Sequence, residues 1–138
     1  MSNSTDGRAG RTAYWITTAA SAVAFAIPGA ANLARVPHIA SDMAHLGYPP
    51  YFLTLLGTWK LLAAIAILAP RFPRLKEWAY AGMLFDLTGA AFSRAMMHDG
   101  PAMVAVPLLV GTVVVASWAL RPASRRWPAL PDVPVRRM

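Results

Sequence analysis

The sequence contains no cysteine and is poor in charge, above all in acidic residues. Of its 138 residues only 14% are charged, with six Asp and Glu against 13 Lys and Arg, whereas a soluble domain carries about a quarter charged residues. Without thiols the chain has no disulfides, no thiolate metal ligands and no dithiol redox cycle of its own. A redox role would therefore require a cofactor, a lipid-soluble substrate or a partner protein to carry the electrons.

What the chain has in abundance is apolar residues. Hydrophobic residues make up 57% of the sequence and the mean hydropathy is +0.43. The net charge of +7 would suggest nucleic acid as a partner of a soluble protein. Here the basic residues occur in short segments between apolar runs, which is typical of membrane topology. We therefore predict an integral membrane protein whose main partner is the lipid bilayer, and we exclude nucleic-acid binding.

Four apolar runs are each about as long as the 20 residues that a helix needs to cross a bilayer. They predict an all-α bundle of four transmembrane helices over residues 13–120, preceded by a polar tail (residues 1–12) that we expect to be disordered. A basic, proline-rich tail follows over residues 121–138. A signal peptide is the alternative for the first run, but that run is longer than a typical signal-peptide core. The runs are Ala13–Ala34, Tyr51–Pro70, Trp78–His98 and Pro101–Leu120.

The segment between the first two runs, Arg35–Pro50, is too polar to cross a membrane and too apolar for a plain loop. Ile39, Met43 and Leu46 recur at the spacing of one helix face, which predicts a short amphipathic helix lying in the interface. Gly47 is expected to end this helix.

Basic residues fix the expected orientation. Only Arg35 and Arg94 fall on one side of the predicted bundle, and Lys60 falls within it. The positive-inside rule therefore places both termini in the cytoplasm. The other side carries ten basic residues: Arg8, Arg11, Arg71, Arg74, Lys76, Arg121, Arg125, Arg126, Arg136 and Arg137.

Two charges of opposite sign fall inside the predicted membrane segments. Lys60 and Asp86 each lie about 13 residues from the turn at Arg71–Arg74, so they are expected at similar depth on antiparallel neighbours. An unpaired charge at that depth costs about 2.5–3.5 kcal/mol on insertion scales. Two interpretations remain open. The pair is either a structural tie between two helices, or it lines a polar pocket for a lipophilic molecule or a proton path.

Small and polar residues accompany both charges at helical spacing. Gly82, Asp86, Gly89 and Ser93 form one stripe, and Gly57, Lys60 and Ala64 form another. Small residues at such positions let neighbouring helices approach closely, so both stripes are predicted to face the bundle interior.

All three histidines are expected at the outer face, beside Arg94. Their spacing matches no zinc-binding pattern, so we predict no metal site, and haem ligation by His45 and His98 is disfavoured because haem ligands usually come from the crossings themselves. The predicted substrate-binding residues are Lys60, Asp86, Arg94, Asn32, His45 and His98, with Asp86 as the candidate catalytic residue.

Several motifs resemble the small bacterial DoxX-like membrane proteins, in the same order and spacing from about Tyr14 to Pro122. They are His45–Pro49 (HLGYP), Leu56–Leu61 (LGTWKL), Pro70–Gly82 (PRFPRLKEWAYAG) and Phe85–Ala90 (FDLTGA) followed by Ser93. The resemblance implies a four-helix protein of the bacterial cytoplasmic membrane. Relatives often carry histidine after this serine, where the present chain has Arg94, which stays charged and cannot titrate as an imidazole does.

The resemblance also implies a function, because the family takes its name from subunits associated with quinone-linked sulfur oxidation. We therefore expect a subunit that binds quinone or another lipophilic small molecule and supports a membrane redox enzyme, with no intrinsic cofactor. One alternative is a stand-alone membrane isomerase or cyclase that uses Asp86 as acid or base. Another is a structural or transport protein held together by Lys60 and Asp86. A redox-enzyme partner or a homo-oligomer is compatible with the sequence.

Overall fold

A computed structural model describes residues 3–126, which form five α-helices and one short 3₁₀-helix without any strand in this range. The predicted all-helical fold is confirmed. Residues 1–2 and 127–138, which include most of the predicted C-terminal tail, lie outside the described residues. The helices are α1 (Asn3–Leu33), α2 (Pro37–His45), α3 (Tyr51–Leu68), α4 (Pro73–Met96), α5 (Pro101–Ala119) and η1 (Ala123–Arg125).

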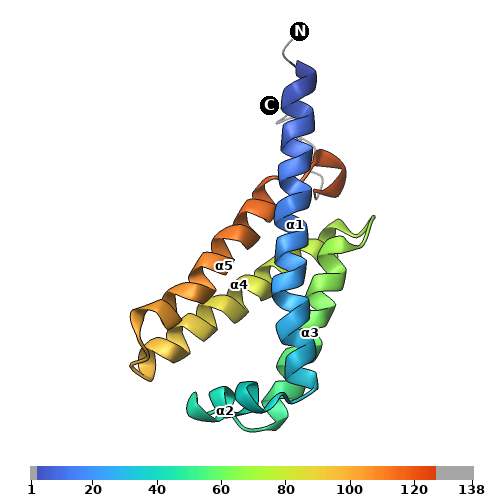
Figure 1. The fold of residues 1–138 in the computed structure, drawn as a ribbon. Helices are drawn as coiled ribbons and strands as arrows, with labels where there is room; N and C mark the ends of the chain where they lie inside the picture. Colours follow the sequence, from blue (N-terminus) through green and yellow to red (C-terminus); the bar gives the residue numbers. More distant parts are fainter. Residues whose placement is uncertain (1–2, 127–138) are drawn as a thin grey trace, which may run out of the picture.

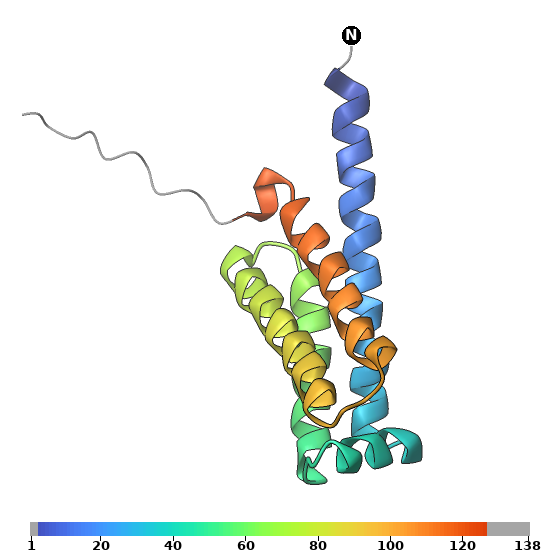
Figure 2. The same ribbon diagram turned by 90° about the vertical axis from the view of Figure 1, so that its left-hand side faces the viewer.

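The four long helices form two pairs, α1 with α3 and α4 with α5, which diverge towards the end of the bundle where the short α2 lies (Figure 1). α1 packs against α3 and α5, and α4 packs against the same two helices from the other side. α1 extends beyond the other helices at its N-terminal end (Figure 2). Because four long helices follow one another up and down, α1 begins and η1 ends at the end of the bundle opposite α2 (Figure 1).

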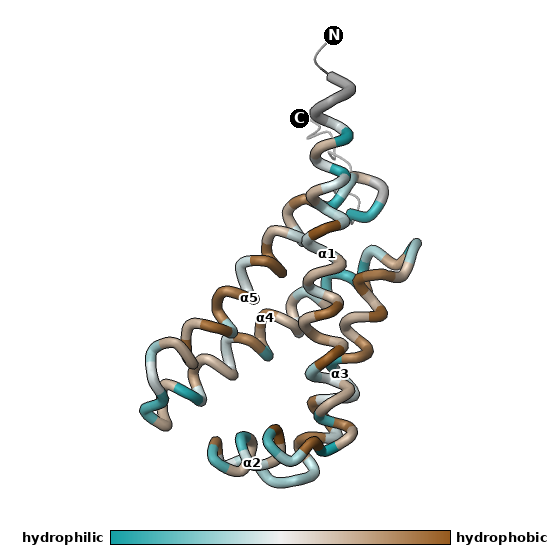
Figure 3. Tube along the Cα trace, viewed as in Figure 1, coloured by the Kyte–Doolittle hydropathy of each residue, from teal (hydrophilic) through white to brown (hydrophobic). Residues whose placement is uncertain are grey.

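Three of the helices are long and apolar enough to cross a membrane: Gly7–Leu33 within α1, α3 and α5. Apolar residues predominate along α3 and α5, whereas α4 is more mixed (Figure 3). α4 is 24 residues long but carries charged residues in its first two turns, at Asp86 near its middle and at Arg94 near its end. The chain is thus a membrane protein with at least three candidate spans in the described part, and α4 differs from them in composition rather than in length.

Parts of both predicted tails are ordered in the described residues. Residues 3–12 continue α1 as helix, because a helix that is already nucleated gains one backbone hydrogen bond for each residue added. At the other end, Arg121 is only 3% exposed and pairs with Glu77 of α4. This ion pair, together with Arg126 donating to the carbonyls of Ala119 and Arg121, keeps residues 121–126 on the bundle.

The core contains a buried hydroxyl network at the end of the bundle away from α2. Ser117 of α5 lies 2.8 Å from the hydroxyl of Thr18 in α1 and 2.7 Å from that of Tyr80 in α4. All three side chains are at most 2% exposed. Because buried hydroxyls are costly without partners, this network fixes how α1, α4 and α5 meet.

Candidate functional site: a cavity between α3 and α4

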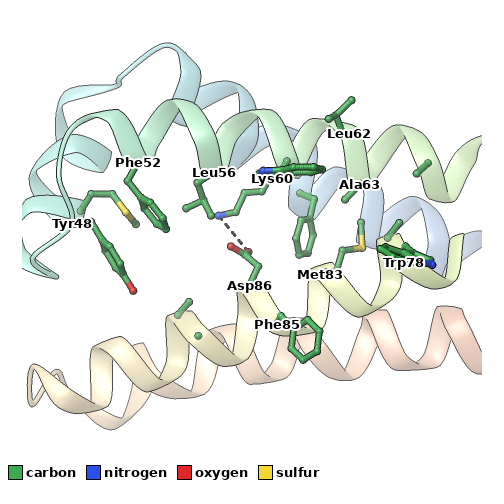
Figure 4. A pocket seen from close by; sticks show the side chains of 18 of the residues that line it. Tyr48, Phe52, Leu56, Lys60, Leu62, Ala63, Trp78, Met83, Phe85 and Asp86 are labelled. Carbon is green, nitrogen blue, oxygen red and sulfur yellow. Dashed lines mark ion pairs between the residues drawn. The ribbon is translucent and has the colours of Figure 1, made fainter. Parts of the chain in front are cut away.

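A cavity of about 620 Å³ lies between α3 and α4, closed at one end by residues of α2 and the segment after it. Its walls are almost entirely apolar, and Figure 4 shows side chains of both helices pointing into it. The volume falls within the range of small-molecule sites, which are typically apolar with a few polar groups that fix orientation. Lining residues labelled in the figure include Tyr48, Phe52, Leu56, Trp78, Met83 and Phe85.

Lys60 and Asp86 meet within this apolar cavity. The ammonium nitrogen of Lys60 lies 3.6 Å from Oδ2 of Asp86 (Figure 4), and the two side chains are 18% and 17% exposed. The predicted pairing of these two residues is confirmed. At 3.6 Å the contact is longer than a charge-assisted hydrogen bond of about 2.8 Å. The pair therefore keeps hydrogen-bonding capacity that a bound molecule can use.

A close helix crossing behind Lys60 holds this residue in place. A Cβ built on Gly29 of α1 would lie 3.0 Å from Cβ of Lys60, and one built on Gly57 of α3 would lie 2.7 Å from the carbonyl oxygen of Gly29. Only glycine fits at these two positions without a shift, so α1 and α3 approach backbone to backbone. This contact fixes the wall of the cavity from which Lys60 projects.

The glycines beside Asp86 have a different role from the one predicted. Gly82 and Gly89 line the cavity, and a Cβ built on either would meet nothing within 4 Å. The prediction that they let a neighbouring helix approach is wrong. They are one turn before and about one turn after Asp86, so the missing side chains leave open space on both sides of the carboxylate.

A cluster of polar residues joins α2 to α4 at the end of the cavity that α2 covers. Arg94 donates to Asp42 of α2 at 2.5 Å and to Asp99 in the turn after α4 at 3.1 Å. Nε2 of His45 lies 2.8 Å from the other oxygen of Asp99. The hydrogen bond from His45, followed by that from Arg94, lowers the pKa of Asp99 below its ordinary value. We call Asp42, His45, Arg94 and Asp99 the polar cluster.

The structure does not bring all six predicted binding residues together. Lys60 and Asp86 line the cavity, whereas Arg94 and His45 belong to the polar cluster. Asn32 is 2% exposed at the crossing of α1 and α3, where its side chain lies against Gly57. His98 is exposed in the turn after α4, with a φ of 56°. Their positions on different helices and different helix faces explain this dispersion.

Several residues that matter to the site were not predicted. Trp59 is 63% exposed and forms part of the cavity wall. The hydroxyl of Tyr48 lies 2.7 Å from that of Ser93 and links the segment after α2 to α4. The HLGYP motif drew attention to Tyr48, but only the folded arrangement shows its partner 45 residues away.

Lys76 was predicted as one of the basic residues on the cytoplasmic side, yet it is 1% exposed. Its ammonium group donates to the carbonyl oxygens of Ala66 and Ile67 at 3.0 and 2.6 Å. These carbonyls belong to the last turn of α3, which has no further backbone donors. Lys76 therefore caps α3 and ties the start of α4 to it.

The arrangement can bind a small molecule but offers no strong metal site. In residues 3–126 no three His, Asp or Glu side chains gather in a way that could hold a metal ion. The Lys60 ammonium can only donate hydrogen bonds, and an ionised Asp86 can only accept them. A polar group between them would meet one donor and one acceptor in apolar surroundings, which strengthens both contacts.

Comparison with known proteins identifies the family of the chain. No curated protein and no solved structure matches the sequence. The sequence pattern of the DoxX-like family, however, matches residues 16–117. This range runs from the middle of α1 to nearly the end of α5 and includes the cavity and the polar cluster. The chain belongs to the DoxX-like family of membrane proteins.

Proposed function

We propose that the protein binds a lipophilic small molecule with a polar head, of the quinone type, in the cavity between α3 and α4. In this role it would serve as a subunit that supports a membrane redox enzyme. The observation that carries the proposal is the loose Lys60–Asp86 pair, 3.6 Å apart, inside an apolar cavity of about 620 Å³. Because the chain has no cysteine, the bound molecule or the partner enzyme would carry the electrons.

The depth of the pair narrows the class of ligand. Lys60 lies at the middle of α3, about 14 Å from the start of the helix at about 1.5 Å per residue. A phospholipid keeps its charged headgroup at the interface and cannot place it so deep. A neutral molecule with a carbonyl or hydroxyl oxygen fits better, because it can hydrogen-bond to Lys60 or Asp86 without bringing another charge into the membrane.

The proposal includes α4 as a fourth crossing. α4 packs along both α3 and α5, each apolar enough to span the membrane, and it begins beside the end of α3 and ends beside the start of α5 (Figures 1 and 2). Its charges have partners: Asp86 pairs with Lys60, and Arg94 pairs with Asp42 and Asp99. With four crossings, and with the basic residues at the start of α1 and after α5, we place both termini in the cytoplasm and the protein in the bacterial inner membrane.

Photo-crosslinking with an azido-quinone in native membranes tests this proposal. We expect labelled peptides from α3 and α4, and at least a fivefold loss of labelling in the double variant Lys60→Leu/Asp86→Leu. Gly82→Leu would fill the cavity without changing charge and should reduce labelling similarly. Ala81→Leu is the matched control, since Ala81 is exposed, does not line the cavity and should leave labelling unchanged. Equal labelling of all four proteins, or none of the parent, would refute quinone binding.

A second candidate function is acid–base catalysis by Asp86 on a lipophilic substrate. The observation favouring it is that this carboxylate projects into an apolar cavity beside a cation, a setting common to catalytic acids and bases. Asp86→Asn separates the two functions. It preserves the shape and a hydrogen-bonding group, so quinone labelling should persist, whereas conversion of a substrate in whole-membrane assays should fall by at least about 100-fold if Asp86 transfers a proton.

A further inference from the structure

α2 and the residues after it close one end of the cavity. Met43 of α2, Leu46 directly after it and Tyr48 are lining residues, and they come from the same short segment. α2 lies across the ends of the long helices rather than along them (Figures 1 and 2). The cavity is therefore bordered by α3 and α4, between which it is open at exposed residues such as Trp78 and Phe85, and by a helix of nine residues at this end.

This short helix is held mainly by polar contacts. None of the residues of α2 is buried, so it contributes no fully packed apolar side chain to the core. Its ties to the bundle include the Asp42–Arg94 ion pair at 2.5 Å and the His45–Asp99 contact at 2.8 Å. The Tyr48–Ser93 hydrogen bond lies just beyond its end. An element with few buried apolar contacts opens at low cost in free energy.

A residue with a positive φ lies on each side of α2, at the end of a helix. Arg35, two residues before α2, has a φ of 51°. Gly47, after its C-terminus, has a φ of 82°, and the N–H of Tyr48 donates to the carbonyl of Met43 at 3.0 Å. This is a Schellman ending, which favours glycine at the left-handed position. Arg35 ends α1 in the same way, because the N–H of Val36 donates to the carbonyl of Ala31 at 3.1 Å, so α2 is joined to its neighbours by one short connection on each side.

Arg94 is the residue on which the ties converge. Its guanidinium contacts Asp42 on α2 and Asp99 in the turn after α4, and Asp99 also contacts His45. The side chain of Arg94 is 17% exposed, against 51% for His45. Arginine can hold two carboxylates at once in fixed geometry. Removing it would leave Asp42 without this cation and Asp99 with only His45.

From these observations we propose that α2 is a lid over this end of the cavity and that Arg94 is its latch. When the Asp42–Arg94 and His45–Asp99 contacts break, α2 swings on Arg35 and Gly47 and exposes the cavity to the outer aqueous side. When they form, Met43 and Leu46 close this end of the cavity to water. The lid rests on the proposed function for its purpose, which is to keep water from the Lys60–Asp86 pair while a ligand is bound, and on the proposed orientation for the side to which it opens.

Cysteine accessibility tests the lid directly, because the parent chain has no cysteine. Ala90 lines the cavity one turn beyond Asp86, towards α2. We would introduce Ala90→Cys and measure its reaction with a membrane-impermeant thiol reagent added outside, in membranes containing the full-length protein. Arg94→Met in this background should raise the reaction rate at least fivefold. Ala44→Cys, at an exposed position on α2, is the matched control and should react at the same rate with and without Arg94→Met.

A second variant that breaks the contacts of α2 tests the lid in case Arg94→Met does not fold. The double variant Asp42→Asn/His45→Ala keeps Arg94 and its contact with Asp99. It should also raise the rate at which the thiol introduced at position 90 reacts. Arg94→Lys, which keeps a cation, should react more slowly than Arg94→Met. Unchanged rates at position 90 in both latch variants would overturn the lid. A uniform rise at positions 90 and 44 would also overturn it, because it would indicate general unfolding. No quinone is added, so the outcome does not depend on whether the cavity binds quinone.

Discussion

At the scale of single residues, the Lys60–Asp86 pair shows what a sequence can determine. Each residue lies about 13 positions from the same turn, and this symmetry was enough to predict the contact now seen at 3.6 Å. The polar cluster was beyond such reasoning. Asp42 and Arg94 are 52 positions apart and meet only because α2 reaches towards the end of α4, an arrangement that helical periodicity does not encode.

The Lys60–Asp86 pair is expected to affect the stability of the protein. Asp86→Leu leaves the Lys60 ammonium without its carboxylate in an apolar cavity and should lower the free energy of unfolding by roughly 3 kcal/mol, because a low-dielectric site does not tolerate a lone charge. Lys60→Leu/Asp86→Leu removes both charges and should be close to the parent in stability. Thermal unfolding of detergent-solubilised protein measures both. A double variant no more stable than the single variant would contradict this account.

The stability of the polar cluster is expected to depend on pH through Asp99. Hydrogen bonds from His45 and then Arg94 lower its pKa below the ordinary 3.8. Because the folded-state pKa is depressed, the stabilisation by these contacts is complete above the unfolded pKa and is lost as the pH falls through the folded one. Carboxyl ¹³C NMR of protein labelled at aspartate should give a midpoint below 3.8 for Asp99, rising towards it in His45→Ala. An identical midpoint in the two proteins would show that His45 does not act on this carboxyl.

At the scale of helices, the sequence predicted which segments are helical but not what every small residue does. The starts of α3 at Tyr51 and α5 at Pro101 agree with the apolar runs, since turn residues precede both. Glycines at helical spacing were interpreted alike, yet Gly57 makes a close helix contact and Gly82 borders open space. Composition cannot separate these roles, because a missing side chain admits either a neighbouring backbone or a void.

The two kinds of glycine are expected to respond oppositely to alanine. Gly57→Ala would place a Cβ 2.7 Å from the backbone oxygen of Gly29, so α1 and α3 must separate at a cost of about 1–3 kcal/mol. Gly82→Ala meets nothing within 4 Å and should stabilise α4 by up to about 1 kcal/mol through helix propensity. The melting temperatures of the two variants and the parent, measured in the same detergent, test this expectation. Equal shifts would mean that the crossing of α1 and α3 tolerates a side chain.

Lys76 is expected to matter through the end of α3. Lys76→Met keeps a long side chain but removes the donor to the carbonyls of Ala66 and Ile67, and buried carbonyls left without donors cost about 1–3 kcal/mol each. Lys76→Gln is the matched control, because its amide still donates and should recover part of the loss. Urea or heat unfolding reports the difference. If the two variants behave alike, the hydrogen bonds to α3 contribute nothing measurable.

At the scale of the whole molecule, the distribution of basic residues and the number of long helices agree with the proposed topology. The start of α4, which carries Arg74 and Lys76, and the end of α5, which precedes Arg121, both lie at the end of the bundle from which α1 extends (Figure 1). What the sequence alone could not predict is the cyclic packing of α1, α3, α4 and α5, which leaves α1 and α4 on opposite sides. That packing depends on side-chain shape at every contact, which apolar periodicity does not specify.

The proposed topology predicts opposite accessibility at the two ends of the bundle. A cysteine replacing Ala44 on α2 should react with an impermeant thiol reagent added to intact cells, and a cysteine replacing Ala9 on α1 should react only after the membrane is permeabilised. Both alanines are exposed, so the membrane rather than packing sets the difference. If both cysteines react in intact cells, the number of crossings between them is even. If only the Ala9→Cys protein reacts in intact cells, the orientation is the reverse of the proposed one.

The open space on either side of Asp86 has a consequence for selectivity. Because a Cβ at positions 82 and 89 would meet nothing within 4 Å, a side chain added there occupies the space of the cavity and does not press against a neighbouring helix at its first atom. Chains with this architecture would therefore be restricted to smaller molecules by exchanging glycine for alanine, serine or leucine at these two positions alone. The size of the ligand that the cavity accepts can then change by a few atoms at a time while the packing of the helices stays the same.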